Sequence, residues 1–129
     1  MDCIFCKIIN GEIPSYTIYE DENVKAFLDV NPISNGHTLV IPKKHIENLY
    51  EMDIEDLKNI ELASKKVAEI LKEKLGCPGV TRVQNNEYGQ DVKHYHMHLI
   101  PRYENDNLKL ITDNKDILKP EDVYLKISK

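Results

Sequence analysis

Cysteine is scarce in this chain, with three among 129 residues. An odd number, with two of the three close together as Cys3-x-x-Cys6, does not suit a disulfide framework. In a cytosolic chain that spacing is typical of metal or redox chemistry, and we expect the isolated Cys77 to be a buried structural thiol.

Long hydrophobic runs are absent as well. No apolar segment approaches the roughly 18 to 20 residues of a membrane span. The opening MDCIFCKIIN has an acidic second residue and too short an apolar stretch for a signal peptide. We therefore expect a cytoplasmic protein with no membrane partner.

Basic residues are outnumbered, 17 against 22 acidic ones, which gives a net charge of −5. This deficit argues against broad binding to nucleic acid through the phosphate backbone, although one nucleotide could still sit in a local pocket. The chain has no low-complexity tract, internal repeat or linker-like change in composition, so we expect one domain over residues 1–129.

Strand signals occur on both sides of the middle of the chain. Residues 16–30 are typical of two short strands around a polar turn at 21–23, and residues 37–42 of a buried strand that ends at its proline. Two further strands are expected at about 80–85 and at 93–100.

The clearest helix is predicted over residues 53–75. Asp53 is its expected N-cap and Gly76 its expected end. An apolar stripe at helical spacing should face the core and consists of Leu57, Ile60, Ser64, Val67 and Leu71. Pro120 is placed to open a short final helix. Strands, a long helix and further strands predict an α+β fold with an antiparallel sheet and a helix on one face.

Three of the five histidines stand two residues apart in HYHMHLIPRY, residues 94–103. Because side chains alternate between the two faces of a strand, these histidines would share one face and the apolar residues between them would pack the other. The histidines are His94, His96 and His98, and the apolar residues are Tyr95, Met97 and Leu99. Ordinary hydrogen bonding would explain one such histidine better than three in register.

Two chemical uses of the three histidines remain. Imidazole is the commonest zinc ligand, but adjacent same-face positions lie roughly 7 Å apart, so at most two neighbours could share an ion. Alternatively, one imidazole attacks a substrate while a flanking one binds or protonates a charged group. Neutral imidazole is a competent nucleophile at physiological pH because its ordinary pKa is about 6.5. The spacing favours this second use.

The histidine segment also resembles a known family. With GQDVK before it and IPRY after it, it is similar to the signature of the histidine triad superfamily, and CIFCKIINGEIPSYTIYEDENVKAFLDVNPISNGHTLVIPKKHI resembles the N-terminal half of its members. The resemblance covers about residues 3–103 and is strongest to prokaryotic-type nucleotide hydrolases with an N-terminal cysteine pair. The tail 104–129 is atypical. The resemblance implies an antiparallel sheet of about five strands, one long helix, short terminal helices, and a homodimer across which the sheet extends.

The resemblance also implies roles for individual residues. His96 would be the nucleophile that forms a nucleotidyl-histidine intermediate, His98 would contact the α-phosphate, and His37 would support both. Asp29 would accept hydrogen bonds from the ribose. The remaining expected contacts are Phe27 and Val30 at the nucleoside, Ile4, Phe5, Ile8 and Ile13 at the base, and Asn85 or Asn86 with Gly89 and Gln90 near the phosphate.

The cysteine pair acquires partners through the same resemblance. Members that carry this pair complete a four-ligand structural zinc site with a histidine after IPKK and the first triad histidine, so the implied ligands are Cys3, Cys6, His45 and His94. A closed site of this kind has no catalytic water. A redox role for the pair is the alternative, although no thioredoxin-like helix start follows it.

Asp91 departs from the family pattern, which usually has serine or threonine there. A carboxylate at this position would repel phosphate unless it is protonated or turned toward a cation, and it could affect the choice of leaving group. The loop QNNEYGQ is also about two residues shorter than usual, which leaves Asn85 and Asn86 as alternatives.

The resemblance implies a hydrolase that acts at the α-phosphate of purine nucleoside 5′-phosphoramidates or adenylyl conjugates and releases a nucleoside monophosphate. A dinucleoside polyphosphate hydrolase is one alternative. A nucleotide-binding module with vestigial activity and a metal-binding redox protein are two others.

Overall fold

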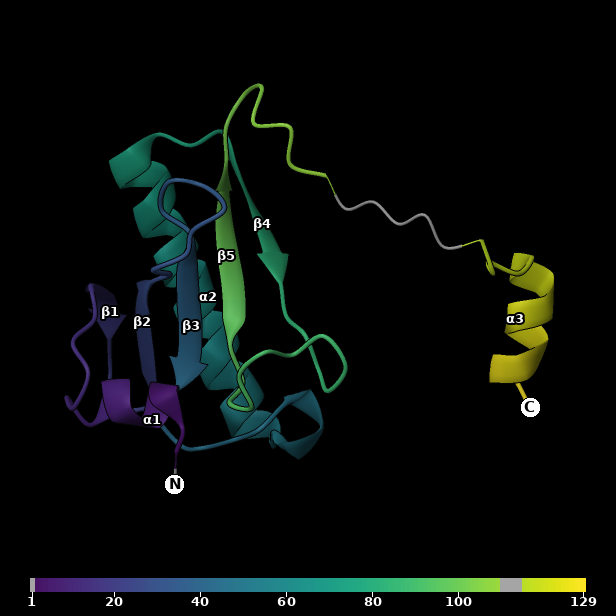
Figure 1. Ribbon diagram of the computed structural model, residues 1–129, viewed down its shortest axis with the longest axis horizontal. Helices are drawn as coiled ribbons and strands as arrows, with labels where there is room; N and C mark the ends of the chain where they lie inside the picture. Colours follow the sequence, from purple (N-terminus) through teal and green to yellow (C-terminus); the bar gives the residue numbers. More distant parts are fainter. Residues whose placement is uncertain (1, 110–114) are drawn as a thin grey trace.

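The protein is built on a five-stranded antiparallel sheet of order β1-β2-β3-β5-β4. The computed structural model describes residues 2–109 and 115–129. The strands are β1 (Thr17–Glu20), β2 (Val24–Leu28), β3 (Thr38–Pro42), β4 (Gly79–Val83) and β5 (Met97–Arg102). The helices are α1 (Ile4–Ile9), α2 (Ile54–Leu75) and α3 (Pro120–Ile127), with a 3-10 turn at Leu49–Glu51. The predicted α+β sheet with one long helix and short terminal helices is confirmed (Figure 1).

The two faces of the sheet are covered by different helices, and the strand residues alternate between them. On one face the core joins α2 to strand residues Val24, Ala26, Val40 and Leu99. On the other face α1 packs on Phe27, Leu39 and Ile41. Figure 1 shows α2 behind the sheet and α1 in front of its lower edge. His98 pairs with Leu39 and so points to the same face of the sheet, the one that α1 covers.

The long helix begins and ends as its sequence predicts. Asp53 and Asp56 form a reciprocal capping box, and Gly76 ends α2 in the left-handed conformation. The buried residues of α2 are Ile60, Ala63, Ser64, Val67 and Leu71. The prediction that Leu57 belongs to this stripe is wrong, because its side chain is 41% exposed. Leu57 lies in the first turn, and burial against the sheet begins only at Ile60.

The two later strands are displaced from their predicted limits. β4 ends at Val83, and β5 begins at Met97, after His94 and His96. Regular pairing of β3 with β5 covers only Val40 to Thr38 against Met97 to Leu99, so the segment before Met97 has no ladder partner. The alternation nevertheless continues through this segment, since Tyr95 joins the α2 core while the His94 and His96 rings contact Phe5 of α1.

The final helix begins at Pro120, as predicted, and Figure 1 shows it apart from the sheet. Several of its apolar side chains are exposed, including Val123, Tyr124 and Leu125. Across the described residues, no helix combines the length and apolar character needed to span a membrane.

Candidate active site and metal centre

A cavity of about 240 Å³ opens on the α1 face of the sheet. Its walls are mostly apolar, with a minority of polar groups that includes Asp29, His96 and His98, which is typical of small-molecule sites. The predicted residues that line it are Ile4, Phe5, Ile8, Ile13, Phe27, Asp29, Val30, His96 and His98. The structure therefore brings together, around one space, residues from α1, β2, β5 and the loops that follow the first two.

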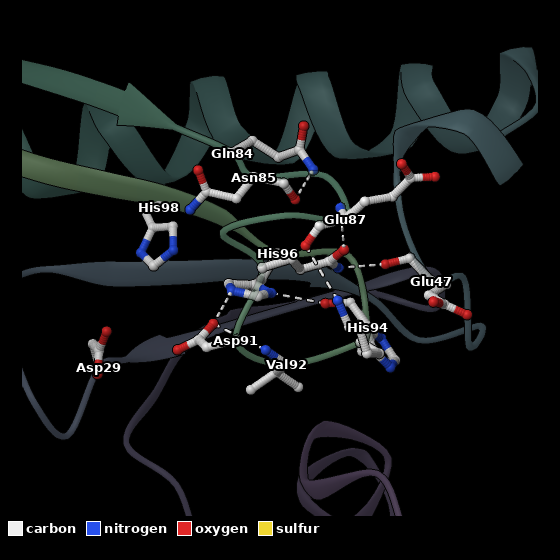
Figure 2. Close-up of polar contacts among 12 residues, drawn as sticks. Asp29, Glu47, Gln84, Asn85, Glu87, Asp91, Val92, His94, His96 and His98 are labelled. Atoms are coloured by element: carbon white, nitrogen blue, oxygen red, sulfur yellow. Dashed lines mark hydrogen bonds and ion pairs between the residues drawn. The ribbon is translucent and has the colours of Figure 1, made fainter. Parts of the chain in front are cut away.

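His96 is held with one ring nitrogen facing this cavity. Its Nδ1 lies 2.7 Å from the main-chain oxygen of His94, which can only accept, so Nδ1 carries the proton. In the neutral imidazole, Nε2 then keeps its lone pair. The ring is only 3% exposed, and its Nε2 lies 3.3 Å from Oδ1 of Asp91 (Figure 2). The geometry gives His96 one fixed nitrogen and one nitrogen available for chemistry.

A chain of hydrogen bonds fixes the tautomer of His98. The backbone N–H of Ile33 donates to Nδ1 of His37 (3.2 Å), so the His37 proton is on Nε2. That N–H donates to Nδ1 of His98 (2.9 Å), which leaves the His98 proton on Nε2. His98 therefore presents an N–H donor that suits an anionic oxygen. Its ring lies against that of His96, with the two centroids 5.0 Å apart.

Burial keeps the two relay histidines neutral. Desolvation lowers the pKa of His37, opposed by the nearby Asp29 carboxylate. Desolvation also lowers the pKa of His98, reinforced by His96 and His37. Asp29 Oδ2 lies 3.6 Å from His37 Nε2. Its other oxygen accepts the N–H of Asn31 (2.9 Å), so the carboxylate is oriented by its own loop.

The turn before β3 places His37 in the relay. Gly36 has φ of +96°, in the left-handed region, and a Cβ added there would collide with Leu75 and Pro101. The N–H of Asp29 donates to the oxygen of His37 (2.9 Å) and closes this turn against the end of β2. The left-handed backbone at position 36 favours glycine, and any other residue would also require the Leu75 and Pro101 side chains to shift.

The loop residues predicted near the phosphate lie outside the cavity lining. The Gln90 side chain is buried, donating to the oxygen of Glu47 (2.6 Å) and accepting from the N–H of Glu87 (3.0 Å). Asn86 accepts from the N–H of Leu49 (2.9 Å). Gln90 and Asn86 thus hold the loop in shape. Asn85 and Gly89 are not among the lining residues either, and substrate contact by this loop stays a prediction.

Sequence reasoning missed part of the cavity wall. Pro14, Ser15, Leu28, Asn31, Leu39 and Val92 line it without having been singled out. Leu39 could have been found from strand register, because it pairs with both Phe27 and His98. The loop residues carry no periodic signal that would assign them to this space.

The second cluster consists of the four residues implied as metal ligands. Cys3, Cys6, His45 and His94 each offer one ligand atom, and all four atoms lie within 4.8 Å of one another. His94 Nδ1 lies 3.4 Å from Cys3 Sγ and 3.6 Å from Cys6 Sγ, His45 Nδ1 lies 3.3 Å from Cys6 Sγ, and the two imidazole nitrogens are 3.1 Å apart. A tetrahedral zinc ion with bonds of about 2.0–2.3 Å requires separations of about 3.3–3.8 Å. These three sulfur–nitrogen distances fall in that range and the nitrogen–nitrogen distance is slightly shorter, so the cluster could hold a metal ion.

The surroundings of His94 also suit a metal ligand. Its Nε2–H donates to the oxygen of Pro42 (2.8 Å), which leaves the Nδ1 lone pair directed at the cysteines. Burial lowers the pKa of His94 to about 4, so the ring is neutral, as a ligand must be. Burial, together with the neighbouring Cys3, raises the pKa of the Cys6 thiol to about 11.

Together the fold and the cavity define a small α+β protein whose mostly apolar pocket is lined by two histidines with fixed tautomers. The HIT domain family matches residues 10–105, and the chain belongs to that family. An uncharacterized HIT-like protein of Methanocaldococcus jannaschii is 58% identical over 106 residues, covering 81% of each chain. A crystal structure of a HIT family member from Bacillus subtilis has a TM-score of 0.86 and 45% identity, covering 99% of this chain and 94% of that one.

Two further similarities bear on chemistry. A zinc-bound histidine triad family protein from Mycobacterium smegmatis has a TM-score of 0.80 and 36% identity, covering 88% of this chain and 84% of its own. A protein of Candida albicans named adenosine 5′-monophosphoramidase is 42% identical over 106 residues, covering 78% of this chain and 70% of its own.

Proposed function

We propose that the protein is a hydrolase acting at the α-phosphate of purine nucleoside 5′-phosphoramidates or adenylyl conjugates. One observation carries the proposal. His96 turns a fixed nucleophilic nitrogen into the cavity, beside the N–H donor that the relay from Ile33 through His37 fixes on His98. Membership of the HIT family and the adenosine 5′-monophosphoramidase among its relatives support the same reaction.

The cavity is suited to a nucleoside. Phe5 and Phe27 meet edge to face, with ring centroids 5.6 Å apart, and with Ile8 they form an apolar wall for a base. Asp29 lies at the rim of the same space, where its carboxylate would accept hydrogen bonds from ribose hydroxyls. The α-phosphate would then lie between His96 and His98.

The reaction would proceed in two displacements. Nε2 of His96 attacks phosphorus while the phosphorus–nitrogen bond breaks, and the departing amine takes a proton from water. The N–H of His98 donates to a phosphoryl oxygen, on which negative charge increases in the transition state. A water molecule then attacks the nucleotidyl-histidine, its protons return to solvent, and the bonding pair returns to Nε2. The products are a nucleoside monophosphate and a free amine.

We further propose that the four-ligand cluster holds a structural zinc ion. These four ligand atoms would fill all four positions of a tetrahedral ion, so no position would be left for a reacting water. The ion would tie α1, through Cys3 and Cys6, to the segments that carry His45 and His94. Its contribution is to hold the wall of the cavity that α1 provides.

A homodimer is part of the proposal. β4 forms one edge of the sheet, and in the described part of the chain its outer side has no strand partner. The other edge strand, β1, is interrupted by an irregular register between Thr17 and Tyr19, which makes it the poorer template. Joining two β4 edges would extend the sheet across a two-fold axis. Sedimentation equilibrium should give twice the mass of one chain.

The deciding experiment is steady-state hydrolysis of adenosine 5′-phosphoramidate beside diadenosine polyphosphates, by the wild type and by His96→Ala. Preference for the phosphoramidate, lost in the variant while nucleotide binding is retained, would support the proposal. Preference for the dinucleotides would keep His96 as nucleophile and move the protein to the other substrate class. Binding without turnover by the wild type would leave a nucleotide-binding module.

A further inference from the structure

Asp91 stands beside the nitrogen on which the proposed reaction depends. Its Oδ1 lies 3.3 Å from Nε2 of His96, and the same oxygen accepts the N–H of Val92 (2.9 Å), which fixes the carboxylate on its loop. The side chain is 81% exposed, so it sits between the buried imidazole and solvent (Figure 2). A leaving group that departs toward solvent at this end of the cavity would pass close to this charge.

In the described part of the chain, no lysine or arginine forms an ion pair with this carboxylate. The imidazole that it contacts, His96, is neutral when its Nε2 acts as the nucleophile. Asp91 also borders a second hollow, whose other charged side chains include Asp2, Glu47 and Lys93. The Lys93 ammonium donates to the main-chain oxygen of Glu87 (3.2 Å), and the three carboxylates outnumber it. The space next to the reacting nitrogen therefore has a negative potential.

We propose that Asp91 selects the leaving group by charge, favouring nucleotidyl conjugates of cationic amines over those whose leaving group is anionic. This inference rests on the proposed function. A phosphoramidate of a diamine or of a lysine-like amine would bring a positive charge next to the carboxylate. A dinucleoside polyphosphate would bring the negative charges of the departing nucleotide. Asp91 thus determines which of the two substrate classes open to His96, phosphoramidates or dinucleoside polyphosphates, is preferred.

The size of the effect follows from the distance and the exposure. A unit charge about 6 Å from a carboxylate, at an effective dielectric constant of about 20, changes a rate by about a hundredfold. The exposure of Asp91 allows solvent and salt to screen much of this, so we expect about tenfold per unit of leaving-group charge.

Three matched substrates isolate this charge. They are adenosine 5′-phosphoramidates of ethylenediamine, propylamine and β-alanine, in which the leaving nitrogen is the same type of amine and the far end is cationic, neutral or anionic. The proteins compared are the wild type, Asp91→Asn, Asp91→Ser and Glu73→Gln. Asp91→Asn keeps the acceptor for Val92, and Glu73→Gln removes one charge from an exposed position on α2.

The wild type and Glu73→Gln should show kcat/KM falling about tenfold from the cationic to the neutral substrate and again to the anionic one. In Asp91→Asn and Asp91→Ser, kcat/KM should become similar for the three substrates. High salt should reduce the differences between them in the wild type. Unchanged ratios in the Asp91 variants, or an equal loss on all three substrates, would overturn the inference. Failure of the wild type to hydrolyse the neutral substrate would instead refute the proposed function.

Discussion

If the cluster holds the proposed zinc ion, its removal should release α1 and open the cavity. A six-residue helix is too short to be stable by itself, so α1 depends on its packing and on the cluster that its cysteines join. Phe5 and Ile8 are 6% and 7% exposed in the folded protein. Burying two such side chains is worth about 3–6 kcal/mol, and less against a compact unfolded state. We expect chelation, or Cys6→Ser, to lower the free energy of unfolding by about 3 kcal/mol.

The same change should weaken nucleotide binding. Ile4, Phe5 and Ile8 supply one wall of the cavity, so an undocked α1 would raise the Kd for adenosine monophosphate at least tenfold, or about 1.4 kcal/mol. Metal content, urea unfolding and calorimetric titration should be measured on the same preparations. Cys77→Ala is the matched control, since Cys77 is buried outside the cluster and this variant should keep its metal. Full stability and unchanged affinity after chelation would show that apolar packing alone holds α1, and would refute the reasoning.

Three further predictions concern the relay. His37→Ala leaves the N–H of Ile33 and Nδ1 of His98 without partners, so urea unfolding should show a free energy of unfolding lower by about 2–4 kcal/mol. The same variant should lower kcat at least tenfold. An unchanged kcat would mean that the tautomer of His98 does not matter. Gly36→Ala should cost about 1–2 kcal/mol by the same assay, mainly from left-handed backbone strain, since the exposed Leu75 side chain can move aside; a neutral result would contradict the strain. Because burial lowers the pKa of His37 and of His98, the unfolded chain binds protons that the folded chain does not. Stability should therefore be level above about pH 6.5 and fall as pH drops from there through the folded values, less steeply in His37→Ala.

The long helix and the order of strands were predictable because they depend on local chemistry. The Asp53 cap, the Gly76 stop and the turn residues between strands each act within a few positions of the chain. The displaced start of β5 was not predictable, because its ladder with β3 stops at Met97 although β3 continues to Pro42, and the N–H of Tyr95 donates to the oxygen of Ile46 instead. The exposure of Leu57 likewise depends on where α2 first meets the sheet.

The candidate site divides in the same way. The sequence by itself determined which face the histidines occupy, because the alternation of side chains is a property of extended backbone, and it supplied the resemblance that paired Cys3 and Cys6 with His45 and His94. Only the tertiary structure decided the protonated nitrogen of His98, because its partner His37 is 61 positions away in the sequence and the two rings meet only in the fold. It also decided that the Asp91 carboxylate lies against Nε2 of His96, since a bent loop with no repeating pattern carries it there. Period and spacing specify which residues can meet, and packing specifies the atoms through which they do.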